Sequence, residues 1–298
     1  MEFFDGHADT LTRLMDSGES LLSNNLSIDY KRLQKYSSYS QFFAAFIDPE
    51  KCENAMEKAP RVAKKLYDEA KRCKITVCKN YADYINAKTR IKAFLSLEGG
   101  YGIDKLSDIK KLQDMGFAMI APTWNTASSM ASGVLDLNDS GLTHFGKRAI
   151  CEMNRLGIII DVSHCSKKSF WDIVKISKRP IVASHSNLKT VVCNIRNLTD
   201  EQFVAISKMG GVAGINFYPP FFGENILALK NHIDRMIELG GEDAIALGSD
   251  FDGVDALPCG LAGAEDIKNV IKSLPYSVKI KEKIAFSNLL RVVRMHSC

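Results

Sequence analysis

Eight short apolar runs, most of them separated by amphipathic stretches, limit how this chain can fold more than any other feature. The runs are MEFFDGH (1–7), YSQFFAAFI (39–47), IKAFLSLEGG (91–100), GFAMIAPTW (116–124), LGIIIDVSH (156–164), RPIVASHS (179–186), GGVAGINFY (210–218) and DAIALGSDFDG (243–253). Short apolar runs bounded by turn residues are typical of buried strands. Stretches with helical periodicity lie between most of them, at 53–72, 105–116, 142–157, 167–177, 198–210 and 225–241. Several of these stretches end in the glycine that commonly follows a helix.

The repeated alternation of strand and helix predicts an α/β fold in which the parallel strands close into a (β/α)8 barrel. An open, doubly wound sheet is the structural alternative. No predicted strand is followed by the G-x-G-x-x-G phosphate loop that such nucleotide-binding sheets usually carry. The chain has 298 residues, a length at which a barrel forms one domain, so we expect a single catalytic barrel domain over residues 1–298.

Composition and charge favour a globular protein of the cytoplasm. Apolar residues make up 46% of the chain and charged residues 25%, and the net charge is +4. The densest basic stretch, residues 60–80, contains acids at helical spacing, which predicts a solvated helix face and no nucleic-acid partner. No stretch approaches the roughly 20 apolar residues that span a bilayer, and no secretory signal pattern opens the chain, so no membrane partner is expected. The eight cysteines form no CxxC pair, and most are expected to be small buried hydrophobes.

Side chains with metal-binding or polar chemistry lie at the carboxyl ends of the predicted strands. They are His7 and Asp9 after the first strand, Glu98 after the third, His164 after the fifth, His185 after the sixth, Tyr218 after the seventh and Asp250 after the eighth. In a barrel all of these ends open onto one face, so the side chains are brought together. His7 and Asp9 are two residues apart in an extended segment and therefore project to the same side.

A single histidine at a strand end is more often a structural residue than a ligand, and Asp9 taken alone could be a capping aspartate. Five potential ligands at equivalent barrel positions instead predict a metal centre. The other three histidines fall in helical or terminal stretches without such partners. We expect them to be surface or packing residues, and they are His144, His232 and His296.

Seven motifs carry a resemblance to a known family. DGHADT, SLEGG, GIIIDVSHCS, PIVASHSN, IRNLTDEQ, GGVAGINFY and GSDFDGV together resemble the membrane dipeptidase (renal dipeptidase) family of zinc metallopeptidases, from one end of the chain to the other. The resemblance implies two zinc ions on a (β/α)8 barrel, with His7 and Asp9 on one zinc, His164 and His185 on the other, and Glu98 as the bridge. It also suggests a homodimer. Unlike the animal members, this sequence shows no signal peptide or lipid-anchor signal.

The chemistry of these residues agrees with the implied site. Imidazole and carboxylate are ordinary zinc ligands, and two dications about 3.5–4 Å apart need a bridging anion. Asp9 and Glu98 leave the metal pair at +2 (four minus two), which favours a bridging hydroxide, and this hydroxide is the predicted nucleophile. Because metal-bound water ionises near pH 7, no serine or cysteine nucleophile is needed. Cys165, the strand neighbour of His164, is expected to point to the opposite face and pack outward.

The resemblance also assigns residues to the substrate. Asp250 matches an acidic residue that orients the amine end of the substrate and moves a proton, whereas a turn-forming role fits Asp252 better. Arg196 matches the arginine that holds the substrate's terminal carboxylate, although without the resemblance it reads as a loop surface arginine. Tyr218 matches a tyrosine near the reacting carbonyl. Asp250 and the bridging Glu98 are thus the predicted catalytic residues.

One position departs from the family pattern. Animal members carry a histidine after the fourth strand that reaches the substrate, and here the matching stretch offers Trp124, which has no ionisable nitrogen. The sequence therefore predicts a zinc-dependent dipeptidase whose substrate range can differ from that of the animal members. One alternative is another binuclear-metal amide hydrolase, such as a deacylase of N-acyl amino acids. The other is an inactive barrel that binds peptides, against which the complete set of five ligands argues.

Overall fold

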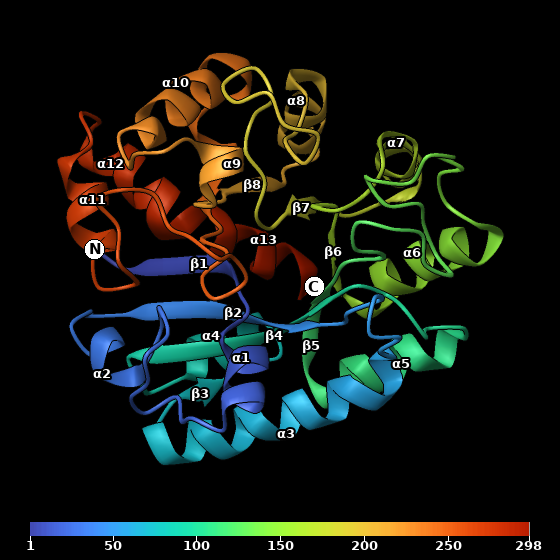
Figure 1. Cartoon of the computed structure of the whole chain (residues 1–298), viewed down its shortest axis with the longest axis horizontal. Coiled ribbons are helices and arrows are strands. Elements are labelled where there is room, and N and C mark those ends of the chain that lie inside the picture. The colour runs from blue at the N-terminus through green and yellow to red at the C-terminus, as the bar shows by residue number, and fades with distance from the viewer. Residues whose placement is uncertain (298) are drawn as a thin grey trace.

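Eight parallel strands close into a barrel in the computed structural model, which describes residues 1–297 (Figure 1). The barrel strands are β1 (Phe3–Ala8), β2 (Tyr39–Phe46), β4 (Ile91–Glu98), β5 (Phe117–Ile120), β6 (Ile159–Asp161), β7 (Ile181–Ala183), β8 (Val212–Ile215) and β9 (Ile245–Leu247). They are ordered β2-β1-β9-β8-β7-β6-β5-β4, and pairing of β2 with β4 closes the ring. The predicted (β/α)8 barrel is confirmed, and each of the eight predicted strands overlaps an observed one.

Six helices lie where the amphipathic pattern predicts them. They are α3 (Ala55–Cys73), α5 (Leu106–Met115), α6 (His144–Leu156), α7 (Lys167–Ile176), α8 (Asp200–Lys208) and α10 (Ala228–Gly240). Local capping explains the ends of α6: the Gly146 amide donates to Thr143 Oγ1 over 2.8 Å at its start, and Gly157 ends the helix with a φ of 72°. These helices surround the strands in Figure 1, with α3 running along one side of the barrel.

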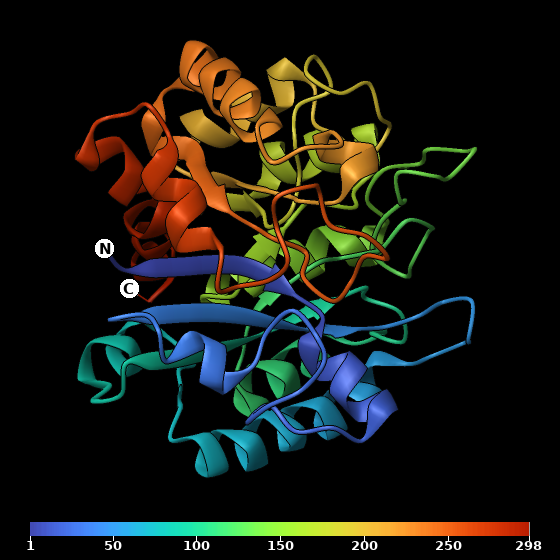
Figure 2. The same cartoon turned by 60° about the vertical axis from the view of Figure 1, so that its left-hand side comes forward.

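The remaining elements have short or weak sequence patterns and were not among the predictions. They are α1 (Thr10–Ser17), α2 (Tyr30–Leu33), β3 (Thr76–Val77), α4 (Tyr81–Asn86), α9 (Pro219–Phe222), a 3-10 turn (Glu242–Ala244), α11 (Ile267–Ser273), α12 (Val278–Glu282), a π-helical turn (Lys283–Ser287) and α13 (Asn288–His296). β3 pairs with the first half of β4, ahead of the residues that pair with β5. β1 and β2 run side by side in the same direction (Figure 2).

A layer of apolar side chains fills the barrel. Each of the eight barrel strands contributes one residue, namely Phe4, Phe42, Phe94, Met119, Ile159, Val182, Val212 and Ala246. The rings of Phe42 and Phe94 are stacked with centroids 5.0 Å apart, and Phe4 stacks on both of them. Leu289 and Val292 of α13 belong to the same cluster, so α13 covers this part of the interior. The polar strand ends therefore lie on a rigid, fully packed support.

Close packing of β7, β8 and β9 depends on two glycines. A Cβ on Gly214 would lie 2.1 Å from the Ser184 carbonyl oxygen, and a Cβ on Gly248 would lie 1.9 Å from the same atom. Only glycine leaves room for such an approach. The arrangement fixes the backbone immediately before His185.

The cysteines differ from expectation. Of the seven within residues 1–297, three are buried and four are exposed, so the prediction that most are buried is wrong. The exposed ones are Cys52, Cys151, Cys193 and Cys259. Each lies in a helix or loop outside the barrel strands, where apolar periodicity does not predict whether a residue this small is buried.

Among the described helices, none is both long and apolar enough to cross a bilayer.

Candidate metal centre

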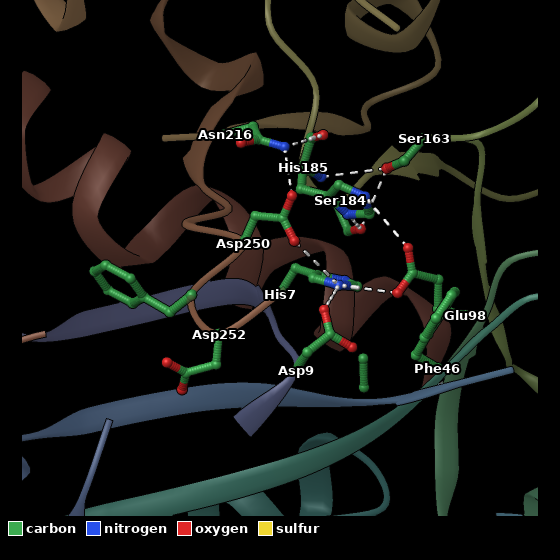
Figure 3. Close-up of polar contacts among 12 residues, drawn as sticks. His7, Asp9, Phe46, Glu98, Ser163, Ser184, His185, Asn216, Asp250 and Asp252 are labelled. Atoms are coloured by element: carbon green, nitrogen blue, oxygen red, sulfur yellow. Dashed lines mark hydrogen bonds and ion pairs between the residues drawn. The ribbon is translucent and has the colours of Figure 1, made fainter. Parts of the chain in front are cut away.

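The five predicted metal ligands converge at the carboxyl ends of the strands, and each is at most 6% exposed. On one side, His7 Nε2 lies 3.2 Å from Asp9 Oδ2. On the other, the Nε2 atoms of His164 and His185 lie 2.8 Å apart. Residues distant in the sequence thus form one buried cluster, as the strand-end positions predict. Figure 3 shows His7, Asp9 and His185 pointing toward the same centre.

Glu98 lies between the two sides and turns one carboxylate oxygen to each. Its Oε2 is 3.3 Å from His7 Nε2, whereas its Oε1 is 2.7 Å from His164 Nε2 and 3.6 Å from His185 Nε2. A carboxylate with one oxygen directed at each half of a site has the geometry of a bridging ligand. The side chain reaches this place because Glu98 is the last residue of β4.

Asp9 does not act as a helix cap, although it occupies the position before α1. Its side chain makes no capping hydrogen bond, and its Oδ1 is buried without a hydrogen-bond partner among residues 1–297. A buried carboxylate oxygen without a partner is costly unless a cation satisfies it. The structure therefore does not support a capping role for Asp9.

Neighbouring side chains orient the two histidines of the second side through their Nδ1 atoms. His164 Nδ1 lies 2.8 Å from Asn125 Oδ1, and His185 Nδ1 lies 2.8 Å from Ser184 Oγ. Ser184 in turn donates to Asp161, so its oxygen accepts the proton of His185 Nδ1. Acceptors at Nδ1 leave the lone pairs of both rings on Nε2, toward the centre.

These residues fit a pair of divalent cations. Two Nε2 lone pairs and Glu98 Oε1 crowd together within 2.7–3.6 Å, an arrangement that repels unless a positive charge lies between them. Imidazole and carboxylate are the ligand types that zinc takes. Three overlapping groups of three close ligand atoms occur here, formed by His7, Asp9 and Glu98, by Glu98, His164 and His185, and by His7, His185 and Asp250.

Burial and charge shift the pKa values of the side chains at the centre. Burial raises the pKa of Glu98 to about 7 and that of Asp250 to about 6. Burial, together with nearby positive charge, holds the pKa of His164 and of His185 well below the usual range. Burial alone would lower the pKa of His7, but the charges of Glu98 and Asp9 outweigh it and hold that pKa well above the usual range. Neutral His164 and His185 are the form that binds metals.

Asp250 approaches the centre from the end of β9 in an unusual backbone conformation. Its φ is 62°, and its Oδ1 lies 3.8 Å from His7 Nε2 (Figure 3). Its Oδ2 accepts a 2.8 Å hydrogen bond from Asn216 Nδ2. Asp252 lies in a turn with a positive φ of 68°, and its side chain accepts from Thr10 Oγ1 and from the Ser27 amide, which ties this turn to two distant parts of the chain. Left-handed backbone at a functional residue persists only where the surroundings enforce it.

Arg196 is buried beside the second side of the centre and is not a surface residue. It is 7% exposed, donates through Nη1 to the Ser163 carbonyl, and places Nη2 3.2 Å from His164 Nε2. Its guanidinium carbon lies 5.6 Å from the centre of the Phe221 ring. A buried guanidinium next to a metal centre is available to a substrate carboxylate.

A cavity of about 440 Å³ borders the cluster, and the other residues predicted for the site line it. Tyr218 and Trp124 both line it, together with Arg196, Asp250 and Phe46. Burial and the neighbouring carboxylate of Asp255 raise the pKa of Tyr218. The volume suits a small substrate.

The residues expected to lie outside the site do so. His144 is exposed at the start of α6, whereas His232 and His296 are buried and bond the carbonyls of Phe222 and Val292. Cys165 packs within the larger hydrophobic cluster, where burial raises the pKa of its thiol. A thiol held in its protonated form is a poor nucleophile.

The sequence reasoning missed the residues that hold the ligands in place. They are Asn125, Asp161, Ser163, Ser184 and Asn216. All five are polar residues in or next to apolar strand runs, and a buried polar residue at a strand end needs a partner. That signal could have singled them out, although not the partner of each.

A parallel barrel with buried imidazoles and carboxylates at the carboxyl ends of its strands defines the class of metal-dependent hydrolases built on a (β/α)8 fold. The comparisons identify the family. A family model described as membrane dipeptidase (peptidase family M19) matches residues 1–297, so the chain belongs to this family. Membership makes it a metallopeptidase that acts on dipeptides.

Similar proteins agree with this assignment. A crystal structure of dipeptidase AC, of family M19, has 26% identity and a TM-score of 0.89 and covers 100% of this chain and 99% of its own. A metallopeptidase from Rhodobacter sphaeroides, solved with a phosphinate mimic of the dipeptide L-Ala-D-Ala, has 25% identity and a TM-score of 0.88 and covers 99% of each chain. An uncharacterized protein in the pqqA 5′ region of Klebsiella pneumoniae is 36% identical over 219 residues, which are 66% of this chain and 79% of that protein.

Proposed function

We propose that this protein hydrolyses the peptide bond of dipeptides with two zinc ions, held by His7 and Asp9 on one side and by His164 and His185 on the other. Glu98 bridges them. The observation that carries the proposal is the Glu98 carboxylate, which turns Oε2 to His7 and Oε1 to the two other histidines. Bound metals would polarise the substrate carbonyl and lower the pKa of attacking water.

Asp250 is the proton carrier in this proposal. Its Oδ2 is held by Asn216, whereas its Oδ1 faces the centre 3.8 Å from His7 Nε2. In the reaction, Oδ1 takes a proton from the attacking water and returns it to the departing amine, which leaves as a neutral group. Tyr218 lines the cavity, and in this proposal it contacts the reacting carbonyl.

Arg196 orients the substrate. Its guanidinium lies next to His164, so a terminal carboxylate bound there directs the C-terminal residue over the second side of the centre. The N-terminal residue then lies toward His7 and Asp250. The phosphinate mimic of L-Ala-D-Ala in the similar Rhodobacter sphaeroides structure supports a substrate of this kind.

The alternatives are a deacylase of N-acyl amino acids and an inactive peptide-binding barrel. A panel of L,L- and L,D-dipeptides assayed beside N-acetyl amino acids, with and without added zinc, separates the three. The proposal expects zinc-dependent release of free amino acids from dipeptides and much slower turnover of the N-acetyl compounds. Faster turnover of the N-acetyl compounds would favour the deacylase, and binding without any turnover would favour the inactive barrel.

We further propose that residues 1–298 act as one catalytic domain in the cytoplasm, as a homodimer. The proposal of a cytoplasmic location rests on sequence composition, and that of a dimer on the family resemblance. Light scattering during gel filtration tests the dimer, for which a mass near twice 33.1 kDa is expected. A mass near that of one chain would contradict it.

A further inference from the structure

Two aromatic rings form one wall of the cavity. Phe46, the last residue of β2, and Trp124, which follows β5, both line it, and their ring centres are 5.1 Å apart. Trp124 is also 5.8 Å from the ring of His164. Both rings are only partly buried by the protein itself. The wall thus offers apolar surface within reach of anything bound over His164.

The position of Phe46 and Trp124 determines which part of a substrate contacts them. Arg196 Nη2 lies beside Nε2 of His164. Asn125, which follows Trp124 in the sequence, contacts Nδ1 of the same imidazole. A residue whose carboxylate is held by Arg196 therefore lies over His164, with Trp124 beside it. His7 and Asp250, which would receive the N-terminal residue, are on the other side of Glu98.

We infer that Trp124 and Phe46 form the subsite for the side chain of the substrate's C-terminal residue, and that this subsite selects large apolar side chains over small or charged ones. The inference rests on the proposed function, since it needs the carboxylate on Arg196. It makes Trp124 a specificity-determining residue. Burial of a side chain against two aromatic faces removes apolar surface from water, which favours leucine or phenylalanine over glycine.

The alternative is that the subsite binds an acidic side chain of the substrate through Lys58. This lysine of α3 lines the same cavity with its Nζ 6.0 Å from the Phe46 ring centre. Its charge is already paired, because Nζ donates to Glu53 Oε2 over 2.5 Å. Binding a substrate carboxylate there would place it close to Glu53, and repulsion between the two carboxylates disfavours it. The apolar occupant is therefore the one that we propose.

The test measures kcat/KM of the zinc-loaded enzyme for L-Ala-Xaa dipeptides, with Xaa as glycine, alanine, leucine, phenylalanine or glutamate in both stereochemical series. The parent enzyme should prefer leucine or phenylalanine over glycine by roughly 10- to 100-fold. Trp124→Ala should reduce this preference to about 3-fold or less, whereas Trp124→Phe should retain most of it. Retention by the phenylalanine variant distinguishes lost apolar contact from a misfolded site.

The chain's other tryptophan provides a matched control. Trp171 lies on α7, packs against Phe170 and is not part of the cavity wall, so Trp171→Ala should leave the preference unchanged. In a Trp171→Phe variant, Trp124 is the sole tryptophan, and its fluorescence should respond to a phosphinate mimic of Ala-Leu more than to one of Ala-Gly. Metal content is measured for every variant to show that the centre is intact.

Three outcomes would overturn the inference: equal kcat/KM across the apolar series, an unchanged preference in Trp124→Ala, or glutamate as the best residue with its advantage lost in Lys58→Met. In each case dipeptides are still hydrolysed, so the proposed function stands. If no dipeptide is hydrolysed by the zinc-loaded parent enzyme, the proposed function fails instead.

Discussion

Asn216 Nδ2 donates a 2.8 Å hydrogen bond to Asp250 Oδ2, and this bond joins the end of β8 to the loop that follows β9. The same Nδ2 lies 3.4 Å from the His185 carbonyl oxygen, so Asn216 connects three neighbouring strand ends. Asp250 holds a φ of 62° there. The bond leaves only Oδ1 of Asp250 free to face the metal centre. Asn216 is therefore a positioning residue for Asp250.

Replacing Asp250 by asparagine should lower kcat by roughly 10²–10⁴, because the variant keeps the shape of the side chain but cannot carry a proton. Metal content should stay near two per chain. Metal analysis is the decisive control, because Asp250 also belongs to one of the groups of close ligand atoms. Loss of a metal together with activity would show that Asp250 is a ligand, and unchanged activity would contradict its role altogether.

Replacing Asn216 by alanine should lower kcat by roughly 10- to 100-fold and change the pH profile. The hydrogen bond from Asn216 lowers the pKa of Asp250, which burial raises to about 6. Without the bond that pKa rises further, so the acidic limb of the pH–kcat profile should move to higher pH. Asn154→Ala, on α6 and hydrogen-bonded to Ser177, is a matched buried control that should not move the limb. A uniform loss of activity with an unmoved limb would count against the positioning role.

Replacing Arg196 by methionine should reduce kcat/KM for dipeptides by roughly 10- to 150-fold, since a charge-assisted grip on a carboxylate contributes about 1.5–3 kcal/mol. A dipeptide amide lacks the charged carboxylate, so the parent enzyme should hydrolyse it poorly and the variant should lose little further. Both substrates are compared in both proteins at equal metal content. Equal losses for the acid and the amide would mean that Arg196 acts on His164 or the backbone and not on the substrate.

His232 should make the fold sensitive to acid. It is buried in α10, bonds the Phe222 carbonyl through Nε2, and burial lowers its pKa from 6.5 to about 4. Above pH 6.5 it is neutral in the folded and the unfolded chain. As the pH falls from 6.5 to 4, only the unfolded chain takes up the proton, so the free energy of unfolding decreases, by about 3 kcal/mol at the low end.

His232→Gln keeps a donor for the Phe222 carbonyl but does not titrate. Urea unfolding at pH 7 and pH 4 should therefore show a smaller acid-induced loss of stability in the variant than in the parent. Metal release at low pH affects both proteins alike and cancels in the comparison. An equal loss in the two proteins would show that His232 is protonated in the fold.

The barrel and the cluster of candidate ligands could be predicted because both depend on periodicity and strand position. His164 and His185 are 21 residues apart in the sequence but each follows a parallel strand, and the barrel brings such positions together. Asn216 could not be assigned a partner, because its bond to Asp250 depends on the stagger of β8 against β9. Arg196 could be assigned to the site only through the family resemblance, since no local pattern reveals that its loop folds inward. β3, at two residues, is too short to give a pattern.

Zinc titration of the metal-free protein tests the central claim most directly. The bound metal and the rate of dipeptide hydrolysis are measured together as zinc is added, for the parent and for Glu98→Gln, which loses the charge between the two sides. The parent should bind two equivalents per chain and reach full activity only as the second is bound. Glu98→Gln should bind both more weakly, because the bridging anion is gone. Full activity of the parent at one equivalent, or weakened binding of only one metal in the variant, would contradict a binuclear centre bridged by Glu98.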